Sequence, residues 1–183
     1  MTNWTRRGFL MAGSATLAAC TAVGINKSRS RIDMDADRAR AELFRTVPGS
    51  RQLAERAAGM LIIPEITEAG LIVGGAYGEG VLMIGDAKVD YFSFTAASFG
   101  LQVGVQKYGH ALFFMTQETL AGFRYSDGWQ LGVDAQYTTA EDAAAIGVST
   151  TTINLPVIAL VFGQQGLIVG ATLEGAKYSR LVR

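Results

Sequence analysis

Glycine recurs inside the stretches of this chain that resemble β-strands, and this pattern constrains the fold more than any other feature. The chain has 22 glycines, and several of its β-rich stretches alternate apolar and polar residues, as in residues 88–95 and 99–106. Glycine weakens a flat strand, but it suits a strand that bends, bulges or approaches another backbone closely. The pattern therefore predicts a strongly curved antiparallel sheet or a small barrel.

Two helices are predicted ahead of the strands. Pro48 ends the first helix, and Ser50 is placed to cap a second, short helix that runs to Arg56. The inner face of the first helix is formed by four apolar residues with helical spacing, Ala36, Ala39, Leu43 and Val47. We therefore expect an α+β protein in which an N-terminal helical pair packs on a mainly antiparallel sheet.

The N-terminus has the features of a bacterial export signal. Arg6 and Arg7 match the twin-arginine pattern. The apolar run over residues 9–19 is too short to span a membrane and has the length of a signal sequence. It ends in Leu17-Ala18-Ala19-Cys20, which resembles the lipobox of bacterial lipoproteins. We therefore expect residues 1–19 to be removed, and Cys20 to carry a diacylglyceryl group and an acyl chain.

The leader also predicts where the mature protein resides and how it divides. Thr21, rather than Asp, follows the cysteine. In the usual sorting pattern of such lipoproteins, this favours anchoring in the outer membrane, with the domain facing the periplasm. Residues 20–34 are expected to form the lipidated N-terminus and a polar linker, and residues 35–183 a single domain.

The charge balance argues against a nucleic-acid-binding protein. The full chain is neutral, and loss of Arg6 and Arg7 leaves 14 basic against 16 acidic residues, a net charge of −2. The basic residues of the linker, Lys27, Arg29 and Arg31, are either solvated or form a patch against an anionic membrane surface.

Few residues suit catalysis. His110 is the only histidine, and Gly109 beside it suggests a turn. One histidine and one acylated cysteine leave no zinc cluster, no Ser-His-Asp triad and no cysteine nucleophile. Glu79 and Glu174 occupy matching places in two similar glycine-rich segments, so they are either turn residues or a carboxylate pair that hydrolyses a glycoside. We predict a protein that is not an enzyme, with no catalytic residue, no metal and no cofactor.

Several motifs resemble those of the SYLF-domain family. The resemblance extends over about residues 36–180, and motifs in this order and spacing are more specific together than any one alone. Residues 98–106 look like the central glycine- and glutamine-rich strand of that family, and residues 165–175 like its closing motif. The motifs that precede them lie at residues 57–64, 69–75 and 78–82.

The resemblance implies a non-enzymatic domain that binds membrane phospholipid. Eukaryotic members bind phosphoinositides through a basic amphipathic N-terminal helix, and some bind and bundle actin. An exported bacterial member would meet neither ligand, so only affinity for anionic phospholipid is carried over. By position, lipid headgroups are expected to contact Arg38, Arg40, Arg45, Arg51 and Arg56. The alternatives are a scaffold that docks another envelope protein and uses lipid only as its anchor, and the hydrolase.

Overall fold

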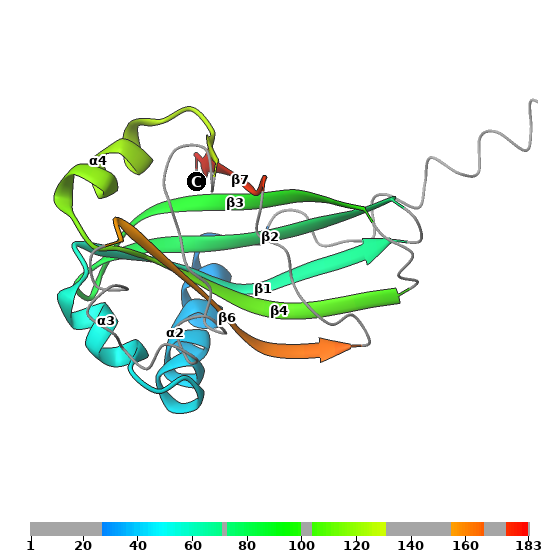
Figure 1. The fold of residues 1–183 in the computed structure, drawn as a ribbon, viewed down its shortest axis with the longest axis horizontal. Helices are drawn as coiled ribbons and strands as arrows, with labels where there is room; N and C mark the ends of the chain where they lie inside the picture. Colours follow the sequence, from blue (N-terminus) through cyan, green and yellow to red (C-terminus); the bar gives the residue numbers. More distant parts are fainter. Residues whose placement is uncertain (1–26, 71–72, 100–103, 131–154, 167–174, 183) are drawn as a thin grey trace, which may run out of the picture.

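One antiparallel sheet with helices on both faces forms the domain (Figure 1). The structure, a computed structural model, describes residues 27–70, 73–99, 104–130, 155–166 and 175–182. The helices are α2 (Arg29–Thr46), α3 (Ser50–Arg56) and α4 (Gln117–Tyr125). The strands are β1 (Gly59–Gly70), β2 (Val73–Ile84), β3 (Ala87–Phe99), β4 (Gly104–Phe114), β5 (Trp129–Gln130), β6 (Val157–Gly166) and β7 (Lys177–Leu181).

The sheet curls into a half-barrel, so the predicted α+β fold with an N-terminal helical pair is confirmed. Its described strands follow the order β5-β7-β3-β2-β1-β4-β6, and every neighbouring pair is antiparallel. The predicted alternation of residues 88–95 lies within β3. Of the alternating stretch 99–106, Phe99 is the last residue of β3 and residues 104–106 begin β4, whereas residues 100–103 lie outside the described residues.

Two glycines of β2 allow its backbone to approach β1 closely. The register between these strands is irregular between Ile62 and Ile66. Opposite this irregularity, a Cβ atom on Gly80 would collide with the carbonyl oxygen of Ile62. A Cβ atom on Gly78 would lie 2.8 Å from the carbonyl oxygen of Glu65. The glycines that suggested a turn around Glu79 therefore serve a strand contact, and that interpretation of Glu79 is wrong.

The sheet separates two apolar clusters. The cluster on the concave face contains the aromatic residues that α4 covers, and the cluster on the other face lies beneath α2 and α3. Phe123 of α4 stacks on Phe92 and Phe114, with ring centroids 4.4 and 4.6 Å apart. Because apolar side chains are buried on both faces, helices are held to opposite sides of one sheet.

The inner face of α2 has the predicted residues, but the helix begins earlier than expected. Ala36, Ala39 and Leu43 are buried, and Ile32 extends the same face towards the N-terminus. Because α2 starts at Arg29, residues 29–34 are helical, although they were expected to belong to the linker.

The predicted cap of the second helix is wrong. Gly49, with a φ of 82°, is the N-cap of α3, and its left-handed backbone turns the chain sharply between the two helices. The hydroxyl of Ser50 donates back to the carbonyl oxygens of Leu43 (3.1 Å) and Val47 (2.7 Å). Ser50 therefore binds the carboxyl end of α2 rather than the amino end of α3.

His110 lies in the middle of β4 and is fully buried, so the expected turn is wrong here as well. Its Nδ1 lies 3.2 Å from the carbonyl oxygen of Leu160, which can only accept, so Nδ1 carries the hydrogen. Its Nε2 therefore accepts from the hydroxyl of Tyr178, 2.8 Å away on β7. Three strands separate β4 from β7 in the sheet, so this bond crosses the concave face.

We predict opposite outcomes for the same substitution at two glycines of β2. Gly80→Ala should lower the free energy of unfolding by about 2 kcal/mol or more, because the new methyl group meets the backbone of Ile62. Gly75→Ala should change it by less than about 0.5 kcal/mol, since the nearest atom, the carbonyl oxygen of Ala96, lies 3.9 Å away. Denaturant unfolding measures both, and equal losses would contradict the close approach of β1 and β2.

We also predict that stability falls in mild acid because of His110. Burial lowers the pKa of this imidazole from 6.5 to about 4, so below pH 6.5 the unfolded chain binds a proton that the folded state refuses. The resulting loss is about 3 kcal/mol between pH 6.5 and 4. The measurement is the pH dependence of the free energy of unfolding, which should be shallower in His110→Gln. The same slope in both proteins would rule out this origin.

Candidate functional site

Helix α2 directs most of its acidic side chains towards the sheet. Asp33 accepts a hydrogen bond from the Tyr91 hydroxyl (2.9 Å). Asp37 forms an ion pair with Lys88 (2.7 Å). The carboxylate of Glu42 lies beside Gly163 of β6, 3.2 Å from where a Cβ atom would stand. Three of the four acidic residues of α2 therefore face β3 or β6.

The opposite side of α2 is positively charged. Arg31, Arg38 and Arg45 recur every seven residues, so they lie on one face, and all three are exposed. The one carboxylate there, Asp35, is shared by Arg31 (3.1 Å), Arg38 (3.4 Å) and Lys27 (3.7 Å). One negative charge is thus shared by three positive ones, and Arg45 lies farther along the same face. We call Lys27, Arg31, Arg38 and Arg45 the cationic face.

The five arginines expected to contact lipid do not share one surface. Arg38 and Arg45 belong to the cationic face, whereas Arg40 turns aside to pair with Asp86 of the β2–β3 turn (2.9 Å). The guanidinium of Arg51 lies over the ring of Phe44, 4.7 Å from its centroid. Arg56 is exposed at the end of α3, and the described part of the chain offers it no ion-pair partner.

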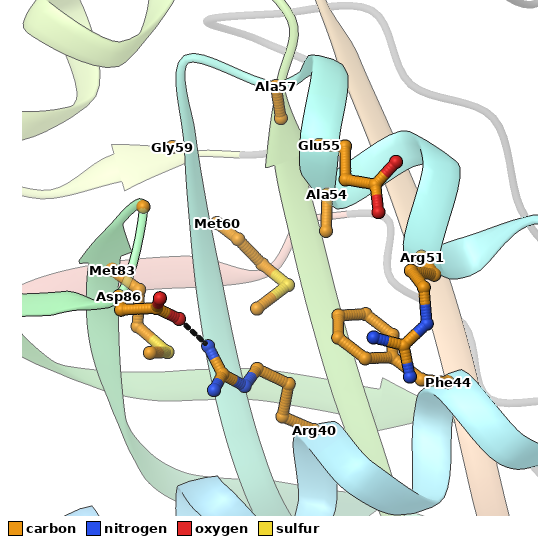
Figure 2. Close-up of a pocket in the computed structure, with 11 residues that line it drawn as sticks. Arg40, Phe44, Arg51, Ala54, Glu55, Ala57, Gly59, Met60, Met83 and Asp86 are labelled. Atoms are coloured by element: carbon orange, nitrogen blue, oxygen red, sulfur yellow. Dashed lines mark hydrogen bonds and ion pairs between the residues drawn. The ribbon is translucent and has the colours of Figure 1, made fainter.

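Arg40 and Arg51 line a pocket of about 280 Å³ between the helices and the sheet, the α2–α3 pocket (Figure 2). Met60 and Met83 project into it from β1 and β2, and the Arg51–Phe44 pair lies on the helix side. Glu55 and Asp86 also line it. Two carboxylates balance the two guanidinium groups, so this pocket has no excess of positive charge to attract an anion.

Glu79 binds the backbone of Lys27, the first residue that the structure describes. Its side chain lies on the helix side of β2, and the residue is 3% exposed. The carboxylate accepts hydrogen bonds from the Tyr77 hydroxyl (2.8 Å) and from the backbone N–H of Lys27 (3.2 Å). A buried carboxylate bonded in this way has a structural role, and its proposed partner Glu174 lies outside the described residues.

Other expected features also lie outside the described residues, namely Arg6, Arg7 and Cys20. None of the helices that the structure describes is both long and apolar enough to cross a membrane. Among the described side chains, no three histidine, cysteine or carboxylate groups gather closely enough to hold a metal ion.

Sequence reasoning named Lys27 and Arg31 as a possible membrane patch of the linker, but it did not place them beside Arg38 on one helix. The seven-residue spacing of Arg31, Arg38 and Arg45 is the signal that could have found the cationic face.

Comparison with known protein families supports the resemblance seen in the motifs. The family described as Ysc84, Las17-binding protein actin regulator, matches residues 95–181, from the end of β3 to the end of β7. The match does not include α2 and α3, so it bears on the sheet rather than on the cationic face. The comparison with curated proteins found no match. Together with the half-barrel sheet and its helical pair, this match supports the resemblance of the chain to the SYLF-domain family.

Proposed function

We propose that this protein is a lipoprotein, anchored to the periplasmic side of the outer membrane through Cys20, whose domain binds anionic phospholipid through the cationic face. The sorting of charge on α2 carries the proposal. Three acidic side chains contact the sheet, whereas Asp35 on the other side is shared by Lys27, Arg31 and Arg38, and Arg45 lies farther along the same face. A cation close to an anionic membrane surface gains about 1 kcal/mol.

The contact with lipid is electrostatic, not an insertion of α2 into the bilayer. The one large apolar side chain exposed on α2 is Met34, and it is 49% exposed. The burial of acyl chains on Cys20, about 0.8 kcal/mol per CH₂, would supply most of the affinity. The cationic face would then orient the domain on the surface, as the second of two membrane signals.

The short stretch of sequence between Cys20 and Lys27 keeps the cationic face near such an anchor. Seven residue steps separate Cys20 from Lys27 and span at most about 25 Å. Helix α2, with 18 residues, is about 27 Å long and begins two residues after Lys27. The short connection therefore favours a position in which the N-terminal half of α2 lies close to the lipid headgroups.

We predict that Arg38→Gln/Arg45→Gln weakens binding to anionic vesicles about 30-fold, since two surface cations are lost. Binding is measured by flotation with phosphatidylglycerol-containing vesicles, using the full chain with Cys20→Ser to remove acylation. The matched control is Arg40→Gln/Arg51→Gln, which removes the same charge from the α2–α3 pocket and should bind like the parent. All of these proteins carry the same leader, so any contribution from it cancels.

Salt and neutral lipid complete this test. Binding should disappear as ionic strength approaches 1 M, where the screening length falls to about 3 Å, and phosphatidylcholine vesicles should bind poorly. Equal losses in both double variants would show that only net charge matters and would contradict a specific face. If the chain binds neither kind of vesicle, lipid serves only as the anchor, and a scaffold docking another envelope protein becomes the better account.

A separate prediction concerns the anchor. Protein isolated from its native envelope should lack residues 1–19 and carry acyl groups on Cys20, as measured by intact mass. Arg6→Lys/Arg7→Lys should leave the precursor in the cytoplasm, and Cys20→Ser should prevent acylation. An uncleaved leader, or an unmodified sulfur atom, in the native protein would exclude the anchor without affecting the cationic face.

A further inference from the structure

A second pocket, of about 390 Å³, lies where the start of α2 meets the edge of the sheet formed by β3 and β7, and we call it the β3–β7 pocket. Three of its lining residues are cations from three different elements, Arg29 of α2, Lys88 of β3 and Arg180 of β7. The α2–α3 pocket also has cations from two elements, but two lining carboxylates balance them, whereas one lining carboxylate accompanies the three cations of the β3–β7 pocket.

Contacts hold each cation in place at the wall of this pocket. The guanidinium of Arg29 lies over the ring of Tyr91, 5.2 Å from its centroid. The ammonium group of Lys88 donates to Asp37 (2.7 Å) and to the carbonyl oxygen of Asp33 (3.2 Å). These two bonds use two of its three hydrogens. Fixed cations lose little further entropy when a ligand binds.

The acidic group that lines the pocket is already neutralised. The side chain of Asp90 is 5% exposed, and its two oxygens bind different arginines. Arg124 of α4 donates to Oδ2 at 2.8 Å, and Arg180 donates to Oδ1. One carboxylate thus holds two guanidinium groups. Arg180 uses one of its five N–H donors in this bond, and its side chain remains 54% exposed at the pocket.

We propose that the β3–β7 pocket binds a phosphate group, carried by a phospholipid headgroup or by a soluble phosphate ester. The planar fork of arginine matches phosphate oxygens, and a lysine adds a point charge. The amino end of α2, where Arg29 is the first residue, contributes a partial positive charge. The volume has the order of magnitude of known small-ligand sites.

The position of the pocket favours a headgroup as the natural source of the phosphate. Arg29 follows Cys20, the proposed anchor, by nine residues, and the fully exposed Val182 lies at the pocket as an apolar neighbour. The assignment of a lipid headgroup as the ligand rests on the membrane attachment proposed above. The binding of phosphate by the pocket does not rest on it. The experiment is therefore designed to separate the two.

The test uses NMR on the full chain with Cys20→Ser, titrated with sn-glycerol 3-phosphate and, separately, with inorganic phosphate. We expect saturable shifts of the amide resonances of Lys88, Tyr91 and Leu181, with a Kd on the order of 1 mM. Arg29→Gln should weaken binding about tenfold, and Arg29→Gln/Lys88→Gln should remove it. The matched control is Arg56→Gln, which removes an exposed arginine of α3 that does not line the β3–β7 pocket. This variant should bind like the parent.

The possible outcomes distinguish the sources. Vesicles containing phosphatidylglycerol that displace glycerol phosphate from these residues would support a headgroup ligand. Glycerol phosphate that binds without displacement by vesicles would support a soluble phosphate ester, and it would stand even if the membrane proposal failed. The inference would be overturned if no shifts appear, or if an Arg29→Gln variant with a native-like spectrum shows the same shifts as the parent. Either result would stand even if the Arg38→Gln/Arg45→Gln result upholds the cationic face.

Discussion

The close approach of β2 to the irregular part of β1 is the constraint on which the rest of the structure depends. At Gly78 and Gly80 the neighbouring backbone occupies the space that a side chain would need. Without that approach the sheet could not curl as tightly. The curl in turn brings β4 and β7 within reach of each other across the concave face, where His110 and Tyr178 share a hydrogen bond. The backbone contact between β1 and β2 thus allows side chains of β4 and β7, which are separated by three strands, to meet.

The other face of the sheet determines how charge is distributed on α2. Lys88 and Tyr91 of β3 provide the partners of Asp37 and Asp33, so the helix rests on the sheet with these carboxylates turned inward. Arg31, Arg38 and Arg45, which lie on another side of the helix, are then exposed to solvent. A helix with nearly equal numbers of positive and negative residues therefore acquires one strongly cationic side. The positive charge of this side of α2 comes from the directions in which its side chains point, rather than from an excess of basic residues in the helix.

Local patterns predicted the fold class well, because apolar spacing reports directly on which face of a helix or strand is buried. Ala36, Ala39 and Leu43 are examples. The start of α2 was harder to predict, since Ser28 makes no side-chain cap hydrogen bond and the first turn has no acidic residue. The cluster at Asp33, Asp35 and Asp37 suggested a helix start, yet these carboxylates lie within the helix and find partners on β3 or among nearby cations.

The misplaced turns have a different cause. Glycine beside Glu79 and His110 has the same local signature whether it opens a turn or admits a neighbouring strand, and only the pairing of distant strands decides between them. The candidate site shows the same limit. Sequence could place arginines in the helical pair, but Arg40 and Arg51 are drawn into a pocket by Asp86 and Phe44, whose proximity arises only in the folded chain.

The bond between Glu79 and the backbone of Lys27 has a practical consequence for how this protein can be dissected. A fragment that starts at Asp35, where the helical pattern first becomes clear, would lack the first turns of α2 and one donor to a carboxylate that is 3% exposed. Deprived of that donor, a buried anion costs free energy in the folded state. The smallest unit that preserves every described interaction of Glu79 with this segment therefore begins no later than Lys27, and fusion partners are best joined upstream of it.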